Sequence, residues 1–370
     1  MLKIKEISIH HVKMKLKSPF QSSIETVNER ESLIIEMKDA DGVIGWGEVV
    51  AFSSPWYTEE TIQTAFHMLK DFLIPIVFKT NINHPKDIQP YFQRLKRNHM
   101  AKAGLDLALW DLYAKRKEKS LSKVLGGKRQ EIEAGVVVSI ESIPKMIEKI
   151  EAYAIEGYRR FKVKISPKMD HQILREIRKH FPNLPLMADA NSAYTLHDIK
   201  HIQSFDQYQL MMIEQPLGAD DLVDHAKLQN VIQTPICLDE SIHSLHDVQS
   251  AIQLNSCKII NVKAGRVGGL TVAKDIHDIC EKKQIPIWCG GMIETGISRA
   301  HNIALASLPN FSIPGDISAS SRYWEEDLIE PEVTINNGII KVPDKPGIGI
   351  KVSRKNLEKY CLHEEKFINS

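Results

Sequence analysis

The sequence has no long apolar run and no excess of charge of either sign. Its apolar runs are short, as at residues 73–78, and none approaches the roughly 20 residues of a membrane-spanning helix. Residues 1–17 alternate apolar and polar side chains and lack the apolar core of a signal peptide. Lys and Arg number 48 against 47 Asp and Glu, a net charge of +1. We therefore expect neither nucleic acid nor a membrane as a partner.

The sequence has few cysteines, and their positions do not indicate disulfide pairs. The five cysteines are odd in number and include no C-x-x-C pair: Cys237, Cys257, Cys280, Cys289 and Cys361. This usage favours a reduced, cytoplasmic protein in which cysteines are small buried apolar residues, over a disulfide scaffold. The chain also lacks an H-E-x-x-H zinc motif, a G-x-S-x-G nucleophile elbow and a P-loop.

The first third of the chain predicts an α+β domain. A length of 370 residues suggests two or three domains or one large one. Residues 2–16, 32–37 and 42–50 are strand-like, and the last two are joined by a turn signal at residues 39–42. Helices are expected from Thr58 to Phe72 and from Ala101 to Lys117. We place this domain at residues 1–127.

Beyond residue 134 the pattern becomes an alternation of strands and helices. The seven apolar runs that predict strands are residues 135–140, 161–165, 186–190, 210–213, 235–238, 257–262 and 285–289, with a weaker eighth at 311–317. Amphipathic segments separate most of them, which indicates repeated β/α units closing into a barrel at residues 128–320. A doubly wound open sheet is the competing fold, but no glycine-rich phosphate fingerprint follows the first strand. The segment 321–370 is too short for a domain, so we expect it to pack on the N-terminal region.

Charged residues end five successive predicted strands at a nearly constant interval. Lys164, Asp189, Glu214, Asp239 and Lys263 are separated by 25, 25, 25 and 24 residues. In barrel enzymes the carboxyl ends of the strands build the active site, so these side chains should converge on one point. Any single member has an ordinary explanation as a solvated loop residue or helix cap, but five at one period favour a site.

The charges of these converging residues indicate which chemistry the site can perform. Three crowded carboxylates repel each other, and a hard divalent cation with oxygen ligands relieves that repulsion. Lys162 shares a strand face with Lys164, and a desolvated lysine near a cation has a lowered pKa that suits a base. A metal flanked by lysines suits removal of a proton α to a carboxylate.

These residues resemble the enolase superfamily, whose members use lysine bases beside Mg²⁺. The matching motifs are K-x-K at 162–164, Asp189 with Asn191, IEQP at 213–216, DES at 239–241, and Lys263, together with GWGE at 45–48. Longer stretches, MADANSAY, WCGGMIETGISRAHN and IPGDISASSRYW, are most similar to the branch of o-succinylbenzoate synthases and N-succinylamino acid racemases. The resemblance implies a (β/α)7β barrel, a modified TIM barrel, with an α+β capping domain completed by the C-terminal tail.

The resemblance also implies a role for each residue. Asp189, Glu214 and Asp239 would bind Mg²⁺, for which Mn²⁺ can substitute. Lys164 would be the base, Lys263 the opposing cation or second acid/base, and Lys162 a support for both Lys164 and the substrate carboxylate. Asn191 and Glu240 would support the ligands. The expected substrate contacts are Ser139, Gly291, Met292, Phe20 and Tyr57, the last two in capping loops near residues 20–23 and 51–57.

Two reactions remain open for a small carboxylate substrate. The first is the Mg²⁺-dependent syn-dehydration of 2-succinyl-6-hydroxy-2,4-cyclohexadiene-1-carboxylate to o-succinylbenzoate in menaquinone biosynthesis, which would make the protein a hydro-lyase. The second is racemisation of N-succinyl or N-acyl amino acids by the same two lysines. A binding protein without activity is a third, weaker alternative. Arg266 in KAGRVGG is either an ordinary surface arginine of a βα loop or a charge that lowers the pKa of Lys263 and so favours racemisation. We also expect a homo-oligomer.

Overall fold

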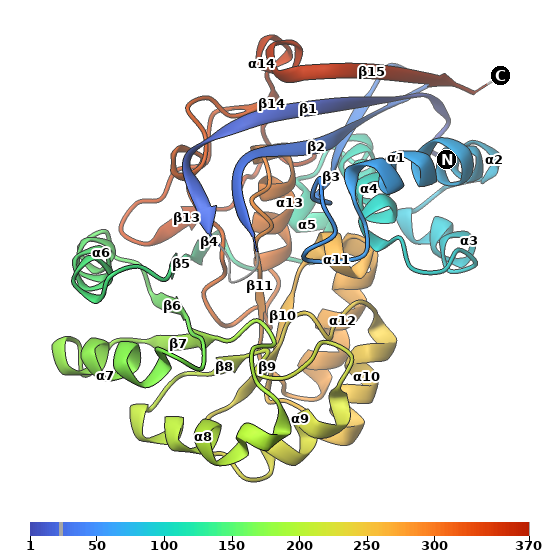
Figure 1. Cartoon of the computed structure of the whole chain (residues 1–370). Helices are drawn as coiled ribbons and strands as arrows, with labels where there is room; N and C mark the ends of the chain where they lie inside the picture. Colours follow the sequence, from blue (N-terminus) through green and yellow to red (C-terminus); the bar gives the residue numbers. More distant parts are fainter. Residues whose placement is uncertain (22–24, 370) are drawn as a thin grey trace.

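Two sheets organise the chain (Figure 1). The computed structural model describes residues 1–21 and 25–369. One sheet has four antiparallel strands in the order β15-β1-β2-β3, and the other has seven parallel strands in the order β11-β10-β9-β8-β7-β6-β5. The expected capping loop near residues 20–23 lies in part outside the described residues.

The antiparallel sheet joins the two ends of the chain. Its strands are β1 (Ile4–Gln21), β2 (Thr26–Asp39), β3 (Ile44–Val49) and β15 (Cys361–Ile368). β1 pairs with β2 on one side and with β15 on the other, so the blue and red strands lie side by side in Figure 1. Burial alternates along the second half of β1, where Val12, Met14 and Leu16 are buried and Lys15 is exposed, as expected for a sheet with one covered face.

Helices cover the apolar face of this sheet. They are α1 (Ile62–Met68), α2 (Ile74–Lys79), α3 (Gln89–Phe92), α4 (His99–Arg116) and α5 (Leu121–Leu125). The first helix begins later than predicted, because Thr61 rather than Thr58 caps it and accepts a hydrogen bond from the Thr64 amide. Helix α4 lies directly on β3.

The parallel sheet is built as the sequence predicts for seven strands. They are β5 (Gly135–Val138), β6 (Arg160–Lys164), β7 (Leu186–Asp189), β8 (Ile213–Glu214), β9 (Ile236–Leu238), β10 (Ile259–Val262) and β11 (Ile287–Cys289). The helices between and after them are α6 (Ile143–Ile155), α7 (Asp170–His180), α8 (Ile199–Gln203), α9 (Leu222–Gln229), α10 (Leu245–Leu254), α11 (Ala264–Val267), α12 (Leu270–Lys282) and α13 (Gly296–Ala306).

The predicted eighth strand, residues 311–317, does not form. Single hydrogen bonds close the curled sheet instead: the Gly135 amide donates to the Gly315 carbonyl, and the Asp316 amide donates to the Cys289 carbonyl. Pro314 has no N–H to donate to a ladder, which explains why this segment bridges β11 and β5 without becoming a strand. Asp316 is thereby placed at the mouth of the barrel.

The C-terminal segment connects the two parts. Its elements before β15 are β12 (Ile329–Glu330), β13 (Ile339–Lys341), β14 (Lys351–Val352) and α14 (Arg354–Tyr360). β13 pairs with β4 (Glu131–Glu133), which precedes the first strand of the parallel sheet. Among the described residues no helix is long and apolar enough to cross a membrane.

Close contact between β3 and α4 gives a first test. A Cβ at Gly47 would lie 2.0 Å from the Gly104 carbonyl oxygen and 2.9 Å from the Ala108 amide nitrogen. Gly47→Ala should therefore force the helix off the sheet and lower the free energy of unfolding by about 1–3 kcal/mol, measured by urea denaturation. Gly218→Ala is the matched control, because its Cβ meets nothing within 4 Å. Equal stability of the two variants would contradict this packing.

Candidate active site

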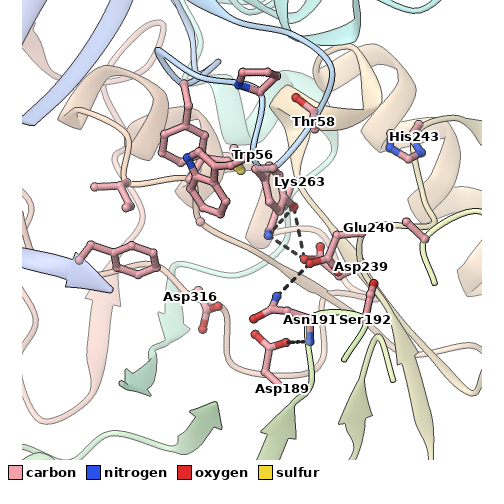
Figure 2. A pocket seen from close by; sticks show the side chains of 18 of the residues that line it. Trp56, Thr58, Asp189, Asn191, Ser192, Asp239, Glu240, His243, Lys263 and Asp316 are labelled. Carbon is pink, nitrogen blue, oxygen red and sulfur yellow. Dashed lines mark hydrogen bonds and ion pairs between the residues drawn. The ribbon is translucent and has the colours of Figure 1, made fainter. Parts of the chain in front are cut away.

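A cavity of about 610 Å³ lies between the mouth of the parallel sheet and a loop of the capping domain. Figure 2 shows Trp56 and Thr58, from this loop, facing Asp189, Asn191 and Asp239 across the cavity. We call residues 50–61 the capping loop. The floor comes from the ends of successive parallel strands, so side chains far apart in the sequence meet here, as the interval of about 25 residues predicts.

The three predicted metal-binding carboxylates all lie buried at this mouth. Asp189 and Glu214 are the last residues of β7 and β8 and pair directly in the register, and Asp239 follows β9. Burial, with repulsion from Asp189 and Asp239, raises the pKa of Glu214 to about 8. The pKa values of Asp189 and Asp239 are lowered despite burial, Asp189 by Lys162 and Lys164, and Asp239 by Arg266 and Lys263. Carboxylate crowding of this kind fits a cation-binding site.

Lys162 lies at the centre of the acidic group. Its Nζ is 2.8 Å from Glu214 Oε2, 3.1 Å from Asp189 Oδ2 and 3.2 Å from Asp316 Oδ2. Asp316 also forms an ion pair with the buried Arg160. Asp316 was not among the predicted site residues, although it ends the eighth apolar run much as the other charges end theirs.

Lys164 is the last residue of β6 and lies next to Asp189 of β7. Its Nζ donates to Asp189 Oδ2 at 2.8 Å and to Asn191 Oδ1. Asn191 in turn donates through Nδ2 to Glu240 Oε1 at 2.9 Å. Burial, with the charges of Asp239 and Asp189, raises the pKa of Glu240 to about 7. Asn191 thus connects Lys164 to Glu240, and the support of the metal ligands that the resemblance implies for these two residues stays a prediction.

Lys263 lies across the cavity, because its strand β10 is separated from β6 by three strands of the curled sheet. Its Nζ donates to Asp239 Oδ2 at 2.8 Å and to the Tyr57 hydroxyl at 2.7 Å. Arg266 is buried rather than a surface loop residue, and it donates to the same two partners, Asp239 and Tyr57. Tyr57 therefore connects the capping loop to both basic groups.

Among the protein groups alone, close carboxylates raise the pKa values of Lys162 and Lys263, and the expected lowering by a bound cation stays a prediction. Burial opposes the charge of Lys263, but Asp239 and Tyr57 outweigh it and raise its pKa, while Arg266 acts in the lowering direction. For Lys162, burial is likewise outweighed by Asp189, Asp316 and Glu214, and the pKa lies well above its usual value. The close carboxylates decide the direction, and their distances cannot be obtained from spacing in the sequence.

Four of the five predicted substrate contacts line the cavity, namely Phe20, Tyr57, Gly291 and Met292. Ser139 follows β5 and is not among the lining residues, which take Val137 from that strand instead. Aromatic residues of the capping loop also contribute: Phe52 and Trp56 pack with ring centroids 4.6 Å apart. Asn261, which sequence reasoning missed, donates to Glu214 Oε1 at 2.9 Å from inside β10.

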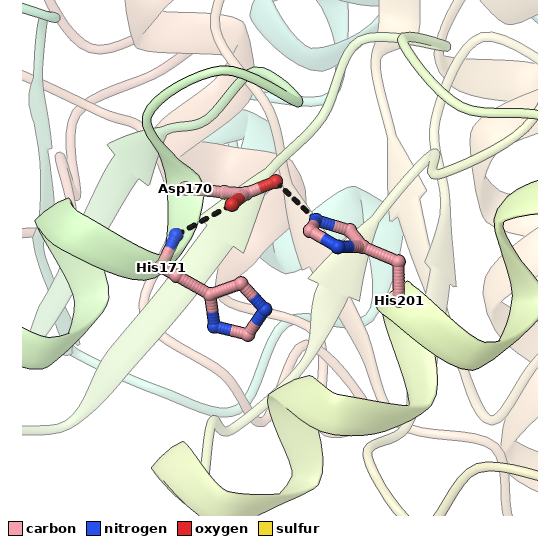
Figure 3. Close-up of side chains that lie close together, drawn as sticks. All are labelled: Asp170, His171 and His201. Carbon is pink, nitrogen blue, oxygen red and sulfur yellow. Dashed lines mark hydrogen bonds and ion pairs between the residues drawn. The ribbon is translucent and has the colours of Figure 1, made fainter.

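A second group of metal-binding residue types lies outside the cavity (Figure 3). Asp170 at the start of α7 accepts hydrogen bonds from His201 Nε2 at 2.7 Å and from the Tyr194 hydroxyl at 2.6 Å. The neighbouring His171 ring is engaged by Tyr208 and Ser204. This cluster connects α7 with the segment after β7, and Asp170, His171 and His201 each have a hydrogen-bond partner within the protein.

Comparisons with known proteins agree with this site. Residues 4–126 match the model of the mandelate racemase/muconate lactonizing enzyme N-terminal domain, and residues 145–356 match the enolase C-terminal domain-like model. The chain therefore belongs to the mandelate racemase/muconate lactonizing enzyme family of the enolase superfamily, and its fold is the fold of that superfamily.

Individual relatives are similar over the full length. The chain is 55% identical to an o-succinylbenzoate synthase from Bacillus subtilis, with 99% of each protein covered. It is 39% identical to an N-succinylamino acid racemase from Thermus thermophilus, with 98% of each covered. A solved structure of an enolase-superfamily member from Listeria innocua superposes with a TM-score of 0.98 at 41% identity and 100% coverage of both chains.

The two clusters give opposite predictions for metal binding. Glu214→Gln keeps the side-chain shape but removes a charged ligand, so the affinity for Mg²⁺, measured by isothermal titration calorimetry, should fall by about tenfold or more. Asp170→Asn, in the cluster of Figure 3, should leave that affinity unchanged. Loss of Mg²⁺ affinity in Asp170→Asn and not in Glu214→Gln would place the metal site outside the cavity.

Proposed function

We propose that this protein is an o-succinylbenzoate synthase, which dehydrates 2-succinyl-6-hydroxy-2,4-cyclohexadiene-1-carboxylate to o-succinylbenzoate for menaquinone biosynthesis. The observation that carries the proposal is the convergence of Lys164, Lys263 and three carboxylates on one cavity. The 55% identity to the Bacillus subtilis synthase supports the choice of reaction.

The carboxylates would hold a divalent cation, and Mg²⁺ is our choice because the donors are hard oxygens. Asp189, Glu214 and Asp239 fit this role, since each lies buried at the cavity floor and Glu214 is crowded by the other two. The bound cation would stabilise negative charge that develops on the substrate carboxylate.

Lys164 performs the proton transfer. In its neutral form it takes the proton from the carbon next to the substrate carboxylate, and Asp189 and Asn191 fix the position of its nitrogen. A syn elimination removes the proton and the hydroxyl from one face of the ring. The protonated Lys164 can therefore return its proton to the departing hydroxide, so that one water leaves as the ring becomes aromatic.

Lys263 provides charge on the opposite face. As an ammonium group held by Asp239 and Tyr57, it stabilises the electron-rich intermediate without moving a proton. Dehydration needs the protonated form of Lys263, and Asp239 and Tyr57 outweigh burial and favour that form. Lys162 adds a second fixed positive charge beside Glu214 and Asp189.

The capping loop excludes water and binds the apolar part of the substrate. Phe52 and Trp56 form an aromatic wall, with Phe20 and Met292 also lining the cavity. Enclosure strengthens the charge interactions at the reacting carbon. Aromatisation makes the chemistry itself undemanding, so a wall that selects by apolar fit is sufficient.

Racemisation of N-succinylamino acids is the second candidate activity. It is favoured by the placement of two lysines on opposite walls, which lets one remove the α-proton and the other return it. The 39% identity to a Thermus thermophilus racemase is consistent with it. The charge of Arg266 opposes the raised pKa of Lys263 and so favours the neutral lysine that racemisation needs; Arg266→Gln should therefore reduce racemisation more than dehydration.

Removing the base provides the direct test of the synthase. Lys164→Ala should reduce kcat for dehydration by at least about a hundredfold, because general acid–base catalysis contributes roughly 10²–10⁴ in rate. Lys263→Ala should also lose most of its turnover. The measurement is disappearance of the cyclohexadiene absorbance with Mg²⁺ present.

Lys168→Ala is the matched control, because Lys168 is an exposed lysine in the loop after the same strand and should keep the wild-type rate. Rapid dehydration by Lys164→Ala would show that the base is misassigned. Absence of dehydration by the wild-type protein, with racemisation present, would replace the proposed function by the second candidate.

A further inference from the structure

The proposed substrate carries two carboxylates, and the site described so far accounts for one. The inference below rests on the proposed function. In the proposed reaction the ring carboxylate would bind at the floor of the cavity, where Lys162 and Lys164 are buried beside the proposed metal ligands. The succinyl group ends in a second carboxylate several bonds away, which must point toward the rim of the cavity. A partly desolvated carboxylate needs a positively charged or hydrogen-bonding partner.

The lining residues offer one permanent cation away from the floor, namely Arg97. It lies between α3 and α4 and is exposed, in contrast to the buried Lys162, Lys164 and Lys263. Within residues 1–21 and 25–369 its guanidinium forms no hydrogen bond and no ion pair. The Arg97 guanidinium, with its five N–H donors, therefore lies at the rim of the cavity without a partner in the described part of the protein.

The backbone holds Arg97 in an unusual conformation. Arg97 and Asn98 both have positive φ, 50° and 54°, which non-glycine residues adopt at a cost. The turn is stabilised locally: Asn98 Nδ2 donates to the Lys96 carbonyl at 2.8 Å, and Lys102 Nζ donates to the Leu95 carbonyl at 2.7 Å. The segment that presents Arg97 is therefore tied to α4.

The other charged groups at the rim define the local balance. His243 lines the same part of the cavity, at the edge opposite Asp316 in Figure 2, and burial lowers its pKa, so it is a neutral hydrogen-bonding group at neutral pH. Glu59 and Asp220 are exposed lining acids. Their negative charges repel the distal carboxylate of the substrate, so Arg97 is the group at the rim that can attract it.

We infer that Arg97 is a specificity-determining residue that binds the distal carboxylate of succinylated substrates, with His243 as a neutral neighbour. The ligand class is an aromatic or amino-acid carboxylate extended by a second carboxylate. Glu59 and Asp220 act in the opposite sense and weaken binding of the same group. Arg97 takes no part in proton transfer, because it lies at the rim rather than beside the lysines.

The test is a pair of ligands that differ in the distal group. Binding of o-succinylbenzoate is compared with binding of 2-butyrylbenzoate, in which a methyl group replaces the distal carboxylate, by calorimetry with Mg²⁺ present. Arg97→Gln should weaken o-succinylbenzoate by about three- to tenfold, as expected for a partly exposed charge pair, and leave 2-butyrylbenzoate unchanged. Lys96→Gln, which removes a neighbouring exposed charge outside the lining, should affect neither ligand.

Two further readouts separate a charge contact from a structural effect. Added salt should weaken o-succinylbenzoate binding to the wild type more than to Arg97→Gln, because salt screens exposed charges. Glu59→Gln should shift the affinity in the opposite direction, toward tighter o-succinylbenzoate binding. In turnover assays, Arg97→Gln should raise KM for N-succinylphenylglycine and leave kcat and the KM for N-acetylphenylglycine near the wild-type values.

Equal weakening of both ligands, or no weakening of either, would overturn the role of Arg97. These results are independent of the proposed reaction, since binding is read without turnover. A wild-type protein that binds o-succinylbenzoate through Arg97 but does not dehydrate the cyclohexadiene would contradict the proposed synthase and retain the subsite. Failure of the wild type to bind o-succinylbenzoate at all would overturn both.

Discussion

Pairing between buried lysines and buried carboxylates is the interaction on which the site depends. Lys162, Lys164 and Lys263 each lie within 2.8 Å of a carboxylate oxygen, from Glu214, Asp189 and Asp239 respectively. Leaving any of these charges unpaired in the interior would cost several kcal/mol, so each lysine orders an acid and each acid orders a lysine. The pairing follows from the sheet: the register places Lys164 beside Asp189 and Asp189 beside Glu214. A divalent cation would bind to carboxylates that the fold already holds close together.

The capping domain completes this array from above. Arg30 of β2 is fully buried and donates to the carbonyls of Val50 and Ala51, which fixes the start of the capping loop. Its guanidinium also lies 4.2 Å from the centre of the Phe52 ring. The same loop then delivers the Tyr57 hydroxyl to Lys263 and Arg266. Burial raises the pKa of Tyr57 to about 12, so its proton remains available for hydrogen bonding. The position of one lysine thus depends on packing in the other domain.

The strand periodicity predicted the central site because parallel strands repeat at a fixed interval and end at one edge of a sheet. That reasoning placed Lys164, Asp189, Glu214, Asp239 and Lys263 together. It did not include Asp316, although this residue lies at the end of the weaker eighth run; that segment closes the sheet by single hydrogen bonds and forms no strand. The burial of Arg266 and the raised pKa of Lys263 depend on distances to Asp239 and Tyr57, and a one-dimensional pattern holds no such distances. The resemblance of motifs supplied roles, and the structure shows which predicted contacts, such as Ser139, lie elsewhere.

The central claim is that Lys164 and Lys263 face the same substrate carbon from opposite sides, and isotope exchange tests it directly. Each enantiomer of N-succinylphenylglycine is incubated in deuterated water with Mg²⁺ and either Lys164→Ala or Lys263→Ala, and loss of the α-proton signal is followed by NMR. The account predicts that each variant exchanges one enantiomer and that the two variants exchange different ones, since each retains the lysine of one face. Exchange of the same enantiomer by both variants, or of both enantiomers by either one, would contradict it.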